Sequence, residues 1–126
     1  MPDTIRDLHG TRVLVCATEG PPISSERDAT DLVGATWGTD VTAVAIPVER
    51  LHPDFFQLAT RLAGAITQKF TTYGLRLIVV GDVSTWTSDS KALRDYVFES
   101  NQRRETWFVR DLAELEHRLA RGREPR

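Results

Sequence analysis

The most apolar run of the chain, Leu75-Arg76-Leu77-Ile78-Val79-Val80, is followed directly by Gly81-Asp82. A short run of aliphatic and β-branched residues that ends at a glycine is typical of a buried strand. We therefore expect residues 75–80 to form the central strand of a sheet. The next stretch, residues 81–90, carries five hydroxyl side chains, which is typical of a loop that leads into a helix.

Strand and helix signals alternate along the rest of the chain. Strands are expected at 5–8, 12–17, 41–46 and 106–109, with a tight turn at His9-Gly10 between the first two. Helices are expected from the capping box at 25–28, over 52–72, over 88–101, and over 112–119 with Asp111 as the cap. This β-β-α-β-α-β-α-β-α order predicts an α/β fold with a single mixed sheet. Residues 1–120 would form one domain, and 121–126 a flexible C-terminal tail.

Composition excludes several classes of protein. The 126 residues carry a net charge of -2, with acids and bases mixed along the chain, so we expect no nucleic-acid partner. Without a signal peptide or an apolar run long enough to span a membrane, the expected location is the cytoplasm. The one cysteine, Cys16, rules out an internal disulfide and a cysteine-based zinc site, and its apolar surroundings predict a buried, inert thiol. We expect no cofactor.

Polar residues follow the third and fourth expected strands. In such a sheet the carboxyl ends of parallel strands gather along one edge, here called the top edge, which is where ligands or partners usually bind. Asp82 could meet a ligand hydroxyl, a metal or a transferred proton, or it could bond its own loop amides. The loop lacks the glycines and Gly-Lys pair of a phosphate-binding loop, and no spacing specifies a metal. The candidate binding residues of the top edge are His52, Asp54, Asp82, Ser84 and Ser88.

A second polar group is expected at the opposite, bottom edge. Lys69 projects from the apolar side of the helix predicted over 52–72, and Glu99 and Asn101 lie at the end of the helix predicted over 88–101. Two interpretations stay open. The three side chains lock the two helices together through a Lys69–Glu99 ion pair, or they line a polar pocket.

A spaced pattern of residues runs over roughly 45–110: Phe55-Phe56, Ala63-Gly64, Gln68-Lys69-Phe70, Tyr73, Gly81-Asp82, Ser84, Ser88, Leu93 and Glu99-Ser100-Asn101. This pattern resembles a bacterial family catalogued as domain of unknown function 4180. The resemblance implies that Lys69, Asp82, Glu99 and Asn101 belong to a shared pattern, but it implies no chemistry.

The order of elements also resembles the STAS fold of bacterial anti-sigma-factor antagonists. Those proteins bind a kinase-like partner and are switched by phosphorylation of a Ser or Thr at the start of the helix after the third strand. Here that place reads Leu51-His52-Pro53-Asp54-Phe55, which has no hydroxyl. The resemblance implies a small regulatory protein-binding module that lacks the usual phosphorylation site. Such a module would bind a partner protein or a second copy of the chain. The alternative is a small enzyme or small-molecule-binding protein, so the residues leave catalysis open.

Overall fold

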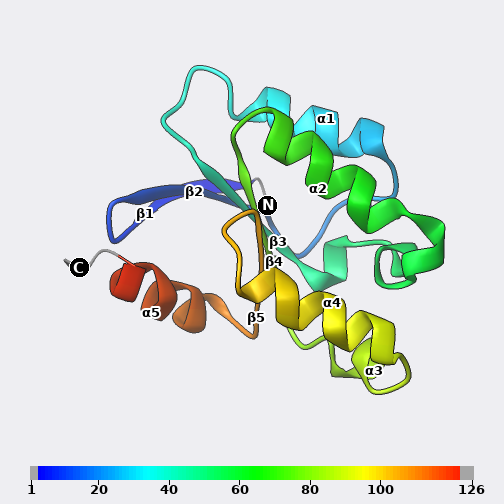
Figure 1. Ribbon diagram of the computed structural model, residues 1–126. Helices are drawn as coiled ribbons and strands as arrows, with labels where there is room; N and C mark the ends of the chain where they lie inside the picture. The colour runs from blue at the N-terminus through cyan, green and yellow to red at the C-terminus, as the bar shows by residue number, and fades with distance from the viewer. Residues whose placement is uncertain (1–2, 123–126) are drawn as a thin grey trace.

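The computed structural model describes residues 3–122 and confirms the expected α/β fold (Figure 1). Within that range one mixed sheet has five strands side by side in sequence order: β1 (Thr4–Leu8), β2 (Thr11–Val15), β3 (Ala43–Pro47), β4 (Arg76–Val80) and β5 (Thr106–Val109). β1 is antiparallel to β2, and every later pair is parallel. The apolar run is thus an internal strand with a parallel neighbour on each side.

The β1–β2 hairpin turns at His9-Gly10, as predicted. His9 has a φ of 55° and Gly10 a φ of 88°, the paired positive values of a tight hairpin turn that follows the twist of its strands. The carboxylate of Asp7 accepts a hydrogen bond from the backbone N–H of Gly10 at 2.8 Å. This turn sets the register that places Leu8 opposite Thr11.

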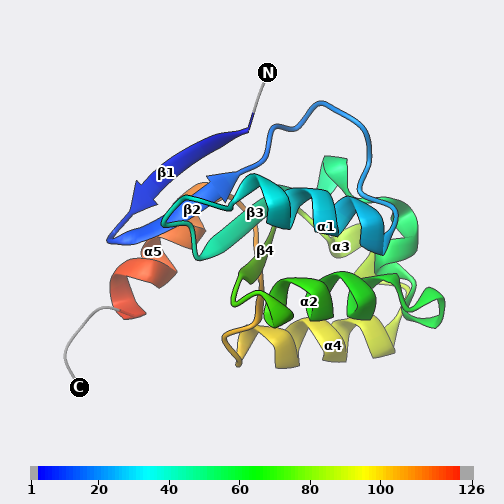
Figure 2. The same ribbon diagram turned by 90° about the horizontal axis from the view of Figure 1, so that it is seen from above.

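Helices cover the two faces of the sheet unequally. α1 (Glu26–Ala35), α2 (Leu62–Thr72) and α4 (Lys91–Asn101) lie on one face, and α5 (Leu112–Gly122) lies on the other (Figures 1 and 2). Right-handed crossovers that step along the sheet in one direction put their helices on the same side. The second face therefore depends on α5, which follows the last strand.

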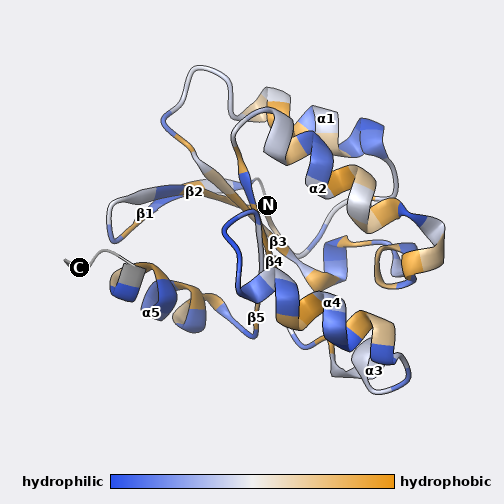
Figure 3. Ribbon diagram, viewed as in Figure 1, coloured by the Kyte–Doolittle hydropathy of each residue, from blue (hydrophilic) through white to orange (hydrophobic). Residues whose placement is uncertain are grey.

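Each face of the sheet has its own apolar core, and apolar and polar residues alternate along the helices (Figure 3). Leu77 and Val79 of β4 belong to the core under α1, α2 and α4, whereas Ile78 between them belongs to the core under α5. This alternation is the period of two that a strand buried on both sides requires. Trp107 of β5 pairs with Ile78 and lies on the α5 side.

The prediction of one long helix over 52–72 was wrong in its first half. That part forms two 3₁₀ helices, η2 (Pro53–Phe56) and η3 (Leu58–Thr60), before α2 begins, and a third, η1 (Val48–Arg50), precedes it. Arg61, with a φ of 65°, interrupts the helix. Tertiary packing overrides the helical pattern because Phe55 and Phe56 are both buried, and Phe56 stacks on Trp86 with ring centroids 4.0 Å apart.

The starts of the three other helices were also predicted. Ser25 caps α1 and Asp111 accepts a hydrogen bond from the N–H of Glu114 at 2.8 Å, both as expected. The helix predicted from Ser88 instead begins at Lys91, with Ser90 as its cap, because the preceding residues form the short helix α3 (Ser84–Thr87). α5 extends to Gly122, so residues 121 and 122 of the predicted flexible tail are helical. Residues 123–126 lie outside the described range.

Candidate functional site

Asp82, at the top edge, holds its own loop together. Its Oδ1 accepts a hydrogen bond from the backbone N–H of Ser84 at 2.8 Å. The same bond lowers the pKa of the Asp82 carboxyl, which is fully exposed. Of the two interpretations offered by the sequence, the structure therefore supports the loop turn. Asp82 and Ser84 border a small hollow of about 200 Å3 beside Phe108.

The other top-edge residues are also used locally. The ring Nδ1 of His52 accepts a hydrogen bond from the N–H of Asp54 at 3.0 Å and lies 3.7 Å from the Asp54 carboxylate. The hydroxyl of Ser88 donates to the carbonyl of Thr85 at 3.3 Å, within the end of α3. His52 and Asp54 do not line the hollow next to Asp82. The top edge therefore does not assemble the five predicted residues into one site.

A separate apolar pocket of about 370 Å3 lies between the top edge and the start of α5, and Cys16 lines it. Burial, and then the nearby charge of Asp3, raises the pKa of the Cys16 thiol to about 12. A thiol with so high a pKa is protonated near neutral pH and is a poor nucleophile. The predicted burial of the thiol is confirmed, and low reactivity stays a prediction that the raised pKa supports.

At the bottom edge, the predicted Lys69–Glu99 ion pair is not formed. The ammonium of Lys69 lies 3.1 Å from the carboxylate of Glu26, which ties α2 to α1 rather than to α4. α1 and α2 pack against each other, so Glu26 of the first turn of α1 comes within reach of Lys69. Glu99 is exposed on α4.

Asn101, the last residue of α4, links α4 to β5 and α5 through hydrogen bonds. Its side-chain oxygen accepts hydrogen bonds from the N–H of Phe108 at 2.7 Å and from Arg118 at 3.2 Å. Its carbonyl accepts a second bond from Arg118 at 2.8 Å. The predicted grouping of Asn101 with Lys69 and Glu99 is therefore wrong, because Asn101 faces α5 and β5.

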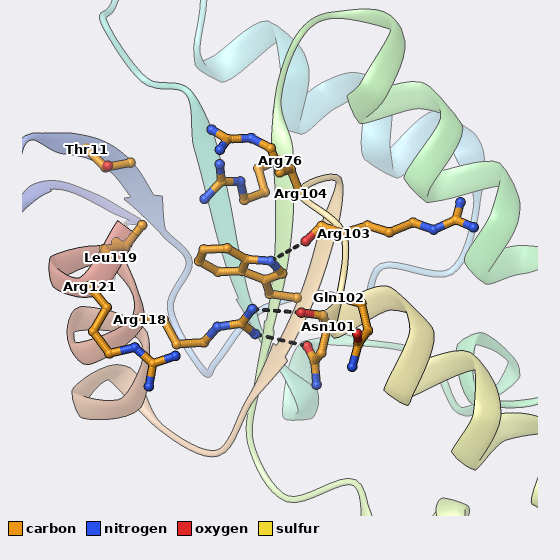
Figure 4. Close-up of a pocket in the computed structure, with 10 residues that line it drawn as sticks. Thr11, Arg76, Asn101, Gln102, Arg103, Arg104, Arg118, Leu119 and Arg121 are labelled. Atoms are coloured by element: carbon orange, nitrogen blue, oxygen red, sulfur yellow. Dashed lines mark hydrogen bonds between the residues drawn. The ribbon is translucent and has the colours of Figure 1, made fainter. Parts of the chain in front are cut away.

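Asn101 also lines a pocket of about 470 Å3 at the bottom edge (Figure 4). Thr11, Gln102 and Leu119 contribute to its wall. Arginine dominates the rest of the lining. We call this hollow the arginine pocket, and its defining residues are Arg76, Arg103, Arg104, Trp107, Arg118 and Arg121.

Three elements bring these arginines together. Arg76 opens β4, Arg104 lies in the turn between α4 and β5, and Arg118 belongs to α5. The guanidinium carbon of Arg76 lies 4.3 Å from the ring centroid of Trp107, and that of Arg118 lies 3.9 Å from it. Cation–π contacts of this length orient both guanidinium groups against one indole. The Trp107 N–H donates to the carbonyl of Arg103 at 2.6 Å, which fixes the ring.

The arginine pocket concentrates like charges. None of its arginines forms an ion pair with a carboxylate within residues 3–122. Burial, and then the charges of Arg104 and Arg118, lowers the pKa of Arg76. Burial is also the main cause of the lowered pKa of Arg118; the charge of Glu114 opposes this shift, and the charge of Arg121 adds to it. Mutual repulsion between fixed cations makes this region a strong attractor for anions.

Sequence reasoning missed this site. It placed the candidate residues at the top edge and around Lys69, Glu99 and Asn101, and of these only Asn101 lines the arginine pocket. One signal was available. Of the 16 basic residues, 14 are arginine, the side chain suited to bidentate contacts with phosphate or carboxylate, and two of them are adjacent at Arg103-Arg104.

A family model described as "Domain of unknown function (DUF4180)" matches residues 8–119. The chain belongs to the DUF4180 family. The matched range of this DUF4180 domain contains every arginine of the arginine pocket except Arg121, and it extends beyond the 45–110 range in which the resemblance was noticed. Comparisons with curated proteins and with solved structures found no match, so the STAS resemblance gains no support.

Among residues 3–122, no group of three or more His, Cys, Asp or Glu side chains is arranged to hold a metal ion. In the same part of the chain, no helix has the length and apolar character needed to cross a membrane.

Proposed function

We propose that this DUF4180 domain is a small regulatory module that binds an anionic ligand in the arginine pocket. The observation that carries the proposal is the convergence of Arg76, Arg104 and Arg118 on a pocket of about 470 Å3 without a carboxylate partner in residues 3–122. Pockets for small molecules commonly enclose about 300–1,000 Å3. Net charge cannot account for the cluster, because the whole chain is slightly acidic.

The repulsion between the arginines of the arginine pocket favours a role in anion binding. Arginine stays protonated at any physiological pH, so the charges cannot be relieved by losing protons. An anion between the guanidinium groups would replace repulsion with charge-assisted hydrogen bonds. Two of the three guanidinium groups are held in place beforehand, Arg76 by Trp107 and Arg118 by Trp107 and Asn101. Groups that are ordered before binding lose less conformational entropy when the ligand arrives.

The lining of the pocket supports binding more than general acid–base catalysis. Its described side chains are arginine, threonine, asparagine, glutamine, leucine and tryptophan, none of which exchanges a proton near neutral pH in water. Groups of this kind can hold and orient an anion. The module has a regulatory role if ligand binding in the pocket changes its affinity for a partner protein.

Thermal unfolding in increasing sulfate, phosphate and citrate tests the proposal. A ligand that binds the folded state raises the melting temperature. Arg104→Gln removes one exposed guanidinium and should weaken anion binding at least about tenfold, since a hydrogen bond to a charged group contributes about 1.5–3 kcal/mol. Arg27→Gln is the matched control, because Arg27 is an exposed arginine on α1 outside the pocket. Equal responses from the two variants would contradict the proposal.

Binding of a partner protein, as the STAS-like order implies, is a second candidate. The observation that favours it is Phe98, whose side chain on α4 is 66% exposed. A partner could contact Phe98 or, separately, the acidic residue Asp54 at the top edge. A pull-down from cell lysate with the wild-type chain, Asp54→Lys and Phe98→Ser is the test. Recovery of the same stoichiometric protein by all three would remove this surface from consideration.

A further inference from the structure

Four of the five arginines of the arginine pocket form two pairs, and the side chain of the fifth, Arg103, points away from them (Figure 4). Figure 4 shows Arg76 and Arg104 together at one end of the pocket, and Arg118 and Arg121 together at the other, on α5. Arg76 is affected by the charge of Arg104 in its own pair and also by Arg118 across the pocket, so the two pairs belong to one charged site. One member of each pair contacts the indole of Trp107, at 4.3 Å for Arg76 and 3.9 Å for Arg118.

We propose that the ligand of the arginine pocket is a small molecule with two phosphate groups, one for each arginine pair. This inference rests on the anion-binding function proposed above and specifies its ligand. Each phosphate would accept hydrogen bonds from two guanidinium groups, and the body of the ligand would cross the pocket beside Trp107.

Phosphate suits each pair better than carboxylate does. A phosphate monoester carries close to two negative charges at pH 7 and presents three acceptor oxygens. It can therefore bond two guanidinium groups at once and balance both of their charges. A carboxylate has one charge and two oxygens, which a single bidentate arginine occupies. A carboxylate would leave the second arginine of each pair without a partner.

The shape of the site favours a small molecule over a nucleic-acid backbone. The two pairs lie in one concave pocket of about 470 Å3, rather than along an extended basic track. The chain as a whole has a net charge of -2, whereas proteins that follow a phosphate backbone usually have a strongly basic surface. Thr11 and Gln102 supply a hydroxyl and an amide that could bond a polyhydroxyl body between the phosphates.

The two pairs can be separated by substitution without disturbing the fold. Arg76 and Arg118 are half-buried and packed on Trp107, but Arg104 and Arg121 are exposed. Arg104→Gln therefore weakens one pair and Arg121→Gln the other, and Arg27→Gln again serves as the control. Unfolding curves without ligand check that all three variants are as stable as the wild-type chain.

Isothermal titration with glucose 6-phosphate and fructose 1,6-bisphosphate, as probes with one and two phosphates, tests the inference. We expect the bisphosphate to bind at least about tenfold more tightly, since a second set of charge-assisted bonds forms. Arg121→Gln should remove most of this advantage while leaving the monophosphate affinity nearly unchanged. Arg104→Gln should weaken both probes, because it belongs to the pair around the more deeply placed Arg76.

The outcomes separate the inference from the function on which it rests. If sulfate, phosphate and both sugar phosphates fail to bind the wild-type chain, the proposed function itself falls. If anions bind but the two sugar phosphates bind equally, or the bisphosphate keeps its advantage in Arg121→Gln, only the two-phosphate inference is overturned. Tighter binding to a single-stranded RNA oligomer, or to vesicles that contain a phosphorylated inositol lipid, would overturn the small-molecule assignment.

Discussion

Arg118 of α5 bonds twice to Asn101 at the end of α4: Nη1 donates to the side-chain oxygen at 3.2 Å and Nη2 to the carbonyl at 2.8 Å. The second bond satisfies a carbonyl that the helix end leaves without an intrahelical partner. Since α4 and α5 lie on opposite faces of the sheet, this pair joins the two layers around the edge strand β5. The same contact orients a guanidinium of the arginine pocket.

Two substitutions of Asn101 should distinguish the contribution of its side-chain oxygen to stability from the contribution of its volume. Asn101→Ala removes the acceptor for Phe108 N–H and for Arg118, and should lower the free energy of unfolding by about 2 kcal/mol. Asn101→Asp keeps an oxygen in that place and should lose much less. Urea denaturation of both variants measures this. Equal losses would mean that the two hydrogen bonds contribute little to stability.

Two glycines should respond to alanine in opposite directions. Gly81 has a φ of 139°, and a Cβ there would lie 2.5 Å from Cγ2 of Val48. Gly81→Ala should therefore cost about 1–3 kcal/mol. Gly64→Ala, inside α2 with no atom within 4 Å of the new Cβ, should gain about 0.5–1 kcal/mol. Thermal melts of the pair are the measurement, and a stable Gly81→Ala would show that Val48 can move aside.

The Cys16 thiol should react only when the chain unfolds. It is buried, and its pKa of about 12 keeps it protonated at the pH values used for labelling. We expect slow modification by iodoacetamide at pH 8 in buffer and complete modification in concentrated urea, both followed by mass. The unfolded chain is its own control for reagent and pH. Rapid modification of the folded protein would contradict the described burial.

Asp28 should make stability depend on pH in the acid range. Its carboxylate accepts hydrogen bonds from the N–H of Ser24 at 2.8 Å and the hydroxyl of Ser24 at 3.2 Å, and the first bond is the main cause of its lowered pKa. A carboxyl whose pKa is lower in the folded state stabilises the fold above its unfolded pKa of 3.8, and the effect is lost as pH falls. Asp28→Asn should therefore be less stable than wild type at pH 7, and the difference should shrink as pH falls below 3.8. Asp89→Asn, an exposed substitution, is the comparison; a gap that stays constant with pH would refute the assignment.

Lys69 should couple energetically to Glu26 and not to Glu99. The Lys69–Glu26 pair has an N···O distance of 3.1 Å but is partly exposed, so its coupling should be about 0.5 kcal/mol and should shrink in high salt. Double-mutant cycles with alanine at Lys69 and at each glutamate measure the two couplings. A larger value for the Lys69–Glu99 cycle would restore the ion pair expected from the sequence.

Local signals were enough to predict most of the fold. Ser25 and Asp111 are followed by residues suited to a helix start, and the apolar run before Gly81 is a buried strand, so the order of elements could be worked out from neighbours in sequence. The break at Arg61 could not, because it depends on where Phe56 meets Trp86, which belongs to a later helix. Similarly, Ser88 and Ser90 are both suitable caps, and the choice between them depends on α3.

The arginine pocket could not be predicted from spacing. Arg76, Arg104 and Arg118 come from a strand, a turn and a helix that are far apart in the chain, and they meet only because α5 packs on the second face beside β5. The expectation that ligands bind at the carboxyl ends of parallel strands pointed to the top edge, at the opposite end of the sheet. There Asp82 and His52 are bonded within their own loops, as short polar side chains near chain turns often are.

The position of α5 also has a consequence for synthesis. The ribosome releases β1 to β5 before the residues of α5, so the face that carries Val13, Ile78 and Trp107 emerges without its cover. Leu115 and Leu119 supply that cover only when the helix at 112–122 leaves the exit tunnel. Until then the nascent chain exposes apolar surface of the kind that chaperones bind. A premature stop before residue 112 would leave it exposed for the life of the protein.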